Sequence, residues 1–156
     1  MRILYLLCCL MFSSVASAGS PNVYTASVKG EFDVVYKHVY DSLEKNRFFV
    51  VLEPDIGKNI SRFAKKWGDD YNRNKLERMK SMVFCNGWYA NLVSNADPEM
   101  VAMCPLHLTM THKAGITSVH FVRPDKVAQG SKAEKVAKEL TEKIIKAIDA
   151  GMKLKN

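Results

Sequence analysis

Two of the four cysteines are the side chains best suited to chemistry in this sequence. Cys8 and Cys9 lie in an apolar run near the N-terminus, whereas Cys85 and Cys104 lie in the body of the chain. A pair of thiols can form a structural disulfide, cycle between dithiol and disulfide, or bind a soft metal ion. The redox state of the compartment, and the secondary-structure elements that position the two sulfur atoms, decide among these three roles.

Cys85 and Cys104 are predicted to lie at adjoining ends of two neighbouring strands. Cys85 follows the apolar run 82–84, and Cys104 precedes an alternating run that starts at Leu106. Antiparallel strands can bring such Cα atoms within the ~4.4–6.8 Å that a disulfide requires. A bridge across a loop of about twenty residues would stabilise the fold by roughly 3 kcal/mol. A structural disulfide is the favoured interpretation, and two buried free thiols or a reactive or metal-bound thiol are the alternatives.

Soft potential metal ligands cluster around Cys104, namely Met100, Met103, His107 and Met110. Sulfur together with imidazole suits copper. However, strand alternation after Pro105 would place His107 and Met110 on opposite faces, and methionines at such spacing more often belong to a core. A copper or haem site is therefore the less favoured hypothesis, and the sequence leaves the metal and the cofactor undetermined.

The sequence lacks the motifs that are typical of several familiar enzyme classes. The chain has no Cys-x-x-Cys, no Cys-x-x-Cys-His, no His-x-x-x-His, no glycine-rich phosphate loop and no Gly-x-Ser-x-Gly. Dithiol redox proteins, covalent haem proteins, zinc proteases, nucleotide-binding enzymes and serine hydrolases usually carry one of these motifs. A protein without catalysis is the favoured hypothesis, and no catalytic residue is assigned.

The N-terminal residues 1–18 predict a secretory signal peptide. Arg2 supplies a positive start, residues 3–15 are apolar, and Ala16-Ser17-Ala18 fits the small-x-small cleavage rule. The apolar run is too short to span about 30 Å of hydrocarbon, so a membrane anchor is the weaker interpretation. We expect an exported protein, periplasmic or secreted, with a single domain over 19–156 and no stable membrane span after cleavage.

The mature domain is basic, and its charge is uneven. Cleavage would remove Arg2 and no acid from the 23 basic and 16 acidic residues, which leaves 22 against 16, or +6. Residues 58–80 hold eight bases and the aromatic residues Trp67 and Tyr71, against only Asp69, Asp70 and Glu77. Such a surface can hold phosphate, nucleic acid or an anionic membrane, but a solvated basic face is the commoner outcome. Because export is predicted, no nucleic-acid partner is expected.

Hydrophobic periodicity places the supporting elements. Period-two runs predict strands, and apolar residues three or four apart predict amphipathic helices. The expected strands are 23–28, 48–52, 82–84, 106–111 and 116–122, and the expected helices are 31–46, 58–67 and 131–150. The run 48–52 is apolar on both faces, which favours an inner strand. The last helix should begin with a capping box of Ser131 and Glu134, end before Gly151, and pack beside the first helix.

This order indicates an α+β domain with two layers. A mostly antiparallel sheet would carry helices on one face in the order strand, helix, four strands, helix, with short helical insertions. The order resembles the TATA-binding-protein-like class, and that resemblance implies a curved sheet with a concave face or a cavity.

A family resemblance rests on the block around the two cysteines. Cys85-Asn86, then Asp97-Pro98-Glu99, then Pro105 before a strand resembles the signature of the family called domain of unknown function 302, over roughly residues 22–125. Two features depart from that pattern, since Gly87 stands where a proline is common and the second cysteine precedes Pro105 instead of following it. The resemblance implies a fold and little mechanism.

Two classes of function are compatible with these observations. The first is a small exported protein that binds an apolar or anionic small molecule, with Cys85, Asn86, Trp88 and His107 near the rim of the site. The second is a thiol/disulfide redox or metal-binding protein that uses Cys85 and Cys104. Self-association as a homodimer is a third possibility that the sequence leaves open.

Overall fold

A computed structural model describes residues 20–153, so the predicted signal peptide 1–18 lies outside the described residues. Five strands form one antiparallel sheet in the order β1-β5-β4-β3-β2. The strands are β1 (Val23–Lys29), β2 (Phe49–Leu52), β3 (Arg78–Cys85), β4 (Leu106–Lys113) and β5 (Ile116–Val122). The helices are α1 (Phe32–Lys45), α2 (Ile56–Ser61), α3 (Ala64–Trp67), α4 (Gly87–Ala96), α5 (Pro124–Val127) and α6 (Glu134–Met152), with 3₁₀ turns η1 (Gly68–Asp70) and η2 (Pro98–Met103).

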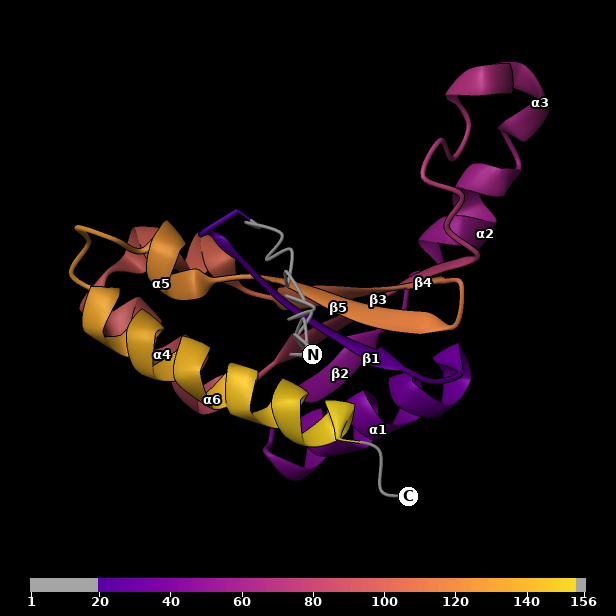
Figure 1. Ribbon diagram of the computed structural model, residues 1–156. Coiled ribbons are helices and arrows are strands. Elements are labelled where there is room, and N and C mark those ends of the chain that lie inside the picture. The colour runs from indigo at the N-terminus through magenta and orange to yellow at the C-terminus, as the bar shows by residue number, and fades with distance from the viewer. Residues whose placement is uncertain (1–19, 154–156) are drawn as a thin grey trace, which may run out of the picture.

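The two long helices cover one face of the sheet, which confirms the predicted α+β arrangement of two layers. Figure 1 shows α1 and α6 side by side beneath the strands. Helix α1 buries one stripe at helical spacing, and its buried residues are Phe32, Val35, Tyr36, Val39 and Leu43. The core-facing strand residues Met82, Phe84, Leu108, Met110 and Phe121 are fully buried against this layer. The strand–helix–four strands–helix order of the main elements is also as predicted.

The prediction that residues 48–52 form an inner strand is wrong. Strand β2 lies at the edge of the sheet and pairs with β3 alone. Phe49, Val51 and Leu52 are 53%, 64% and 60% exposed. An apolar run predicts burial of both faces only if other elements cover both, and of the run 48–52 only Phe48, just before β2, and Val50 pack against the core. A register shift between Val50 and Leu52, followed by Pro54, makes it harder for a further strand to pair with this edge.

The middle segment differs from its prediction in two ways. The expected helix 58–67 is two short helices, because α2 ends at Ser61 and α3 starts at Ala64. Strand β3 begins at Arg78, four residues before the expected start, although Arg78 and Lys80 are basic. Their side chains are accommodated by α1: Arg78 lies over the Phe32 ring at 4.6 Å, and the Lys80 ammonium lies over the Tyr36 ring at 4.3 Å. Cation–π contacts therefore stabilise Arg78 and Lys80 at the start of β3, where the sequence has no apolar alternation that would predict a strand.

Both predicted ends of the last helix need correction. Helix α6 starts at Glu134, where Ser131 Oγ accepts a hydrogen bond from Ala133 N at 3.2 Å and Glu134 Oε2 accepts one from Gly130 N at 2.8 Å. These bonds are shifted by one residue from a capping box, in which Ser131 and Glu134 would cap each other. Gly151 lies inside the helix instead of after it, because α6 continues to Met152 and Gly151 is buried against α1.

The opposite face of the sheet is open and rich in hydroxyl groups. Ser27 Oγ lies 2.8 Å from Ser118 Oγ, and Ser81 Oγ lies 2.7 Å from Thr109 Oγ1. Figure 1 shows this face bounded at one end by α2 and α3, which project away from the sheet, and at the other by α5. The part of the chain that the structure describes holds no helix long and apolar enough to cross a membrane.

Candidate functional site: an apolar cavity at the Cys104–Pro105 end of the sheet

The segment between β3 and β4 folds into α4 and η2, and two side chains fix its course. Asn86 caps α4, because its Oδ1 accepts a hydrogen bond from Tyr89 N at 3.1 Å while its Nδ2 donates to Arg47 O at 3.0 Å. Asp97 caps η2, with carboxylate oxygens that accept from Glu99 N and Lys132 N, each at 3.3 Å. These bonds hold η2 at the end of the sheet, next to the cis peptide bond between Cys104 and Pro105.

A cavity of about 260 Å³ lies at this end of the sheet. Four segments enclose it: η2, the first residues of β4, the last residue of β5, and α5. Its lining residues are Met100, Ala102, Met103, Pro105, Leu106, His107, Val122 and Val127. Seven of these eight side chains are apolar, so the cavity matches the usual composition of a small-molecule site.

Of the described residues that line the cavity, His107 is the only one with a titratable side chain. Strand alternation turns it away from the core, while its neighbours Leu106 and Leu108 are buried. Val122 and Val127 contribute exposed apolar surface near the rim, at 44% and 54% exposure. An imidazole at a mainly apolar wall can fix the orientation of a ligand by one hydrogen bond.

Arg123 and Asp125 hold α5 in place beside this cavity. The Arg123 guanidinium donates two hydrogen bonds to the Asp125 carboxylate, at 3.1 and 2.8 Å, and Asp125 N donates to Thr141 Oγ1 of α6 at 3.0 Å. Burial acts to raise the pKa of Asp125, but the hydrogen bonds and charge of Arg123 outweigh it and hold this pKa below its ordinary value. The ion pair holds the turn of α5 together, and the bond from Asp125 N to Thr141 ties α5, and with it Val127, to the long helix.

Cys85 and Cys104 lie beside the cavity but are not part of its lining. Cys85 is opposite Phe49 of β2, and Cys104 comes just before the pairing of Phe84 with Leu106. Both are partly buried free thiols in the structure. Burial, and secondly the charge of the nearby Cys85, raise the pKa of the Cys104 thiol above its ordinary value. The two thiols are thus close enough to interact, and the disulfide stays a prediction.

The four predicted ligand-binding residues do not lie together in one site. His107 lines the cavity, and Cys85 lies nearby at the end of β3. Asn86 is used as a helix cap, with both halves of its amide bonded to backbone. Trp88 points to solvent from α4 at 66% exposure and does not line the cavity.

Sequence reasoning missed Val122 and Val127 as members of this site. They come from the end of β5 and from α5, far along the chain from η2. Val122 lies at the end of an alternating strand, on its exposed face, and no element is predicted between residues 122 and 131, where α5 lies. The pattern Arg123-Pro124-Asp125, with proline at the first position of a helical turn, is the signal that predicts α5.

The cluster of soft ligands is only partly brought together. Met100, Met103 and His107 share the cavity lining, whereas Met110 is fully buried in the core on the other face of β4, as alternation predicts. Across residues 20–153, no group of three or more histidine, cysteine, aspartate or glutamate side chains is placed to hold a metal ion.

The open face of the sheet is a weaker candidate for a small-molecule site. His120 lies between two hydroxyl groups, with Nδ1 at 3.3 Å from Thr25 Oγ1 and Nε2 at 3.0 Å from Thr111 Oγ1. Burial lowers the pKa of His120, so the neutral imidazole is favoured. These polar groups already form hydrogen bonds with one another. A ligand that used them would have to replace those bonds, which makes this face the weaker candidate.

Comparison with known proteins identifies the family and the fold. The sequence matches the family described as domain of unknown function DUF302 over residues 24–151. The structure is similar to the crystal structure of an uncharacterized conserved DUF302 protein from Bacillus stearothermophilus, with a TM-score of 0.71 and 17% sequence identity over 84% of this chain and 98% of that one. No curated protein matches. The match over most of the chain establishes that this protein belongs to the DUF302 family.

Proposed function

We propose that this protein is an exported ligand-binding protein that holds a small, mainly apolar molecule and does not transform it. The observation that carries the proposal is the 260 Å³ cavity between η2, β4, β5 and α5, with its apolar lining. An engineered cavity of about 150 Å³ with an apolar lining takes benzene, so this one has room for a somewhat larger ring system.

The chemistry of the lining defines the ligand class. Met100 and Met103 are flexible and polarizable, and can adapt to the edge of an aromatic ring. His107 offers one hydrogen-bond donor or acceptor. A ring of the size of indole buries roughly 200 Å². At about 25 cal/mol per Å² this burial contributes ~5 kcal/mol, part of which is offset by the loss of ligand freedom on binding, so the expected dissociation constant is weaker than about 0.2 mM.

Holding is favoured over catalysis because the cavity lacks a paired catalytic group. Among residues 20–153, its lining contains no carboxylate and no cysteine, and no second titratable side chain accompanies His107. The raised pKa of the nearby Cys104 keeps this thiol protonated at neutral pH, where a nucleophile would need a thiolate.

The proposal of export rests on the N-terminal pattern of Arg2, the apolar run 3–15 and Ala16-Ser17-Ala18. Expression of the full chain in a bacterial host, followed by mass measurement of the periplasmic and secreted fractions, tests it. The expected species begins at Gly19. Recovery of the intact chain from the cytoplasm alone would contradict export without affecting the cavity proposal.

Titration calorimetry with indole tests the ligand proposal. We expect Ala102→Phe to abolish indole binding, because Ala102 lines the cavity and a phenyl ring there would fill part of it. Ala150→Phe is the matched control, since Ala150 is an exposed alanine on α6 outside this cavity. Equal indole binding by the two variants, or no heat of binding with the unaltered protein, would contradict the proposal.

A second candidate function is thiol/disulfide exchange or soft-metal binding at Cys85 and Cys104. The observation in its favour is that the pairing of Phe84 with Leu106 places the two cysteines at neighbouring strand ends, where Cys85 adds to the raised pKa of Cys104. The direction of that shift opposes it, because a redox-active thiol usually has a depressed pKa. Metal analysis of the purified protein, together with its absorbance spectrum, distinguishes a copper or haem protein from the ligand-binding protein proposed above.

A further inference from the structure

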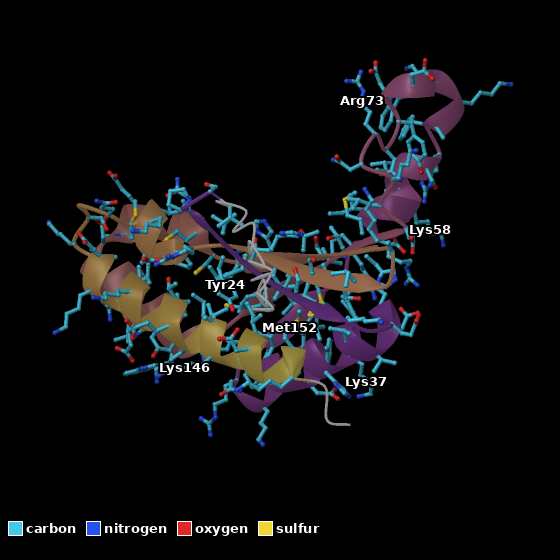
Figure 2. All side chains as sticks on the ribbon, in the orientation of Figure 1. Tyr24, Lys37, Lys58, Arg73, Lys146 and Met152 are labelled. Carbon is cyan, nitrogen blue, oxygen red and sulfur yellow. The ribbon has the colours of Figure 1, made fainter. Side chains whose placement is uncertain are left out.

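We infer that the segment 56–76, called here the arm, docks the protein on an anionic membrane surface. The arm contains α2, α3, η1 and the loop that returns to β3. Figure 1 shows it projecting beyond the sheet, on the side away from α1 and α6. Figure 2 places Lys58 near the root of the arm and Arg73 near its free end.

The arm carries most of the unpaired positive charge of the basic segment. Its bases are Lys58, Arg62, Lys65, Lys66, Arg73 and Lys75, and its acids are Asp69 and Asp70. Within the described residues, Arg73 is the one base of the arm with an ion-pair partner, Asp70. By contrast, Arg78 and Lys80 of β3 are paired with Asp33 at 3.0 Å and Glu53 at 3.1 Å. The free positive charge is thus concentrated on the projecting part.

Two aromatic rings are exposed among these bases. Phe63 and Trp67 stack with their ring centroids 5.1 Å apart and their planes 18° apart, and they are 47% and 40% exposed. Neither side chain belongs to the hydrophobic core. A block of two aromatic rings surrounded by lysine and arginine is the composition of segments that settle at the boundary of headgroups and acyl chains.

The root of the arm is fixed to the sheet, so the arm presents these side chains at a defined place. Asp55 caps α2 by accepting a hydrogen bond from Lys58 N at 2.8 Å. A β-carbon at Gly57 would lie 3.4 Å from Met79 N, so α2 packs directly on β3. Asn72 closes the returning loop, with Oδ1 accepting from Leu76 N and Nδ2 donating to Leu76 O, both at 2.9 Å.

An anionic lipid surface satisfies both features of the arm at once. Each lysine or arginine near such a surface is attracted by the anionic headgroups, and burial of the aromatic pair among the lipids removes apolar surface from water. Nucleic acid would also satisfy the charge, but the Phe63–Trp67 stack leaves each ring only one face for a base, and no nucleic-acid partner is expected of an exported protein. The combination therefore favours lipid over nucleic acid.

Vesicle sedimentation and tryptophan fluorescence test the inference. The chain has two tryptophans, so Trp88→Phe leaves Trp67 as the only indole reporter. We expect this variant to sediment with vesicles of phosphatidylcholine and phosphatidylglycerol, to shift its emission to shorter wavelength on binding, and to be released by high salt. Vesicles of phosphatidylcholine alone should bind at least tenfold more weakly.

Charge reversal on the arm provides the matched comparison. In the Trp88→Phe background, Lys65→Glu with Lys66→Glu should weaken binding to anionic vesicles at least tenfold. Lys138→Glu with Lys146→Glu makes the same change of net charge on exposed positions of α6 and should bind almost as the parent does. Exposed sites are chosen so that both variants fold, which thermal unfolding verifies.

Three results would overturn the inference. The first is equal binding to anionic and neutral vesicles, or no binding to either. The second is equal loss of binding in the two charge-reversal variants, which would indicate a nonspecific effect of net charge. The third is tighter binding to a DNA duplex than to anionic vesicles, lost in the Lys65→Glu, Lys66→Glu variant, which would assign the arm to nucleic acid.

Discussion

Gly151 of α6 lies against Val39 of α1 so closely that a β-carbon on Gly151 would come within 2.6 Å of the Val39 Cα atom. The same carbon would lie 2.9 Å from His38 O. The two long helices therefore cross at a point where only a hydrogen atom fits between their backbones. This contact fixes how α1 and α6 sit side by side under the sheet.

We predict that Gly151→Ala destabilises the protein by about 2 kcal/mol, because overpacking against backbone cannot be relieved by turning a side chain. Alanine has a helix propensity that is better than that of glycine by roughly 1 kcal/mol, and this gain offsets only part of the cost of overpacking. Urea unfolding measures the effect. Gly87→Ala is the control, since Gly87 also lies in a helix but has nothing within 4 Å of its added β-carbon. Equal stability of the two variants would show that the helices do not cross this closely.

A second prediction concerns Glu53, which links the arm side of the sheet to α1. Its carboxylate accepts hydrogen bonds from Tyr36 Oη at 2.7 Å and Lys80 Nζ at 3.1 Å. Burial acts to raise the pKa of Glu53, but these two bonds outweigh it and lower the pKa. A lowered folded-state pKa stabilises the fold above the ordinary glutamate value, and this contribution is lost as pH falls through the folded-state pKa.

Glu53→Gln should therefore lose about 0.5 kcal/mol at neutral pH and lose less further stability on acidification than the unaltered protein does. The estimate is small because the Glu53 side chain is 39% exposed and solvent screens it. Urea unfolding at neutral pH and below pH 4 gives both values. Glu142→Gln, on the exposed face of α6, is the control for removal of one surface carboxylate. A parallel pH profile for Glu53→Gln would be inconsistent with the lowered pKa.

The fold was largely predictable because its long elements have clear periods. Helix α1 and helix α6 each show an apolar stripe at helical spacing, and β4 and β5 alternate cleanly between Leu106 and Phe121. The errors fall where tertiary contacts override local pattern. Strand β2 is apolar yet lies at an edge. Strand β3 starts at basic residues because α1 supplies two aromatic rings and the Asp33 carboxylate, and Glu53, just after β2, supplies a second carboxylate.

A third prediction follows from the raised pKa of Cys104. Burial, and then the charge of Cys85, favour the protonated thiol, so alkylation of reduced native protein by iodoacetamide should be slow at pH 7. Its rate should keep rising to a higher pH than in the urea-unfolded protein. Mass spectrometry of the peptides assigns the reaction to Cys104. In the native Cys85→Ser variant, the alkylation rate of Cys104 should level off at a lower pH than in the unaltered native protein. That pH should still be higher than the corresponding pH of the unfolded chain.

A plateau at lower pH in the native protein than in the unfolded chain would contradict this prediction. It would also favour the redox function, because it would reveal an activated thiolate. The predicted disulfide is tested on the same protein before reduction, as a peptide in which Cys85 and Cys104 are joined.

The candidate site was less predictable than the fold, for a physical reason. The sequence pointed to the neighbourhood of Cys104, Pro105 and His107, since chemistry-bearing residues are dense there, and the structure places a cavity lined by Pro105 and His107 at this point. It assigned ligand roles to Asn86 and Trp88, which the structure uses as a helix cap and as an exposed side chain. A cavity is formed by segments far apart in sequence, so Val122 and Val127 carry no local signal of their role.

The most direct test of the central claim is NMR of the protein labelled at its methionine methyl groups during titration with indole. Met100 and Met103 line the cavity, whereas Met82 and Met110 are fully buried in the core. We predict that the methyl signals of Met100 and Met103 shift progressively and show contacts to the indole ring, while those of Met82 and Met110 stay in place. Unchanged Met100 and Met103 signals at saturating indole would contradict a ligand-holding cavity at this end of the sheet.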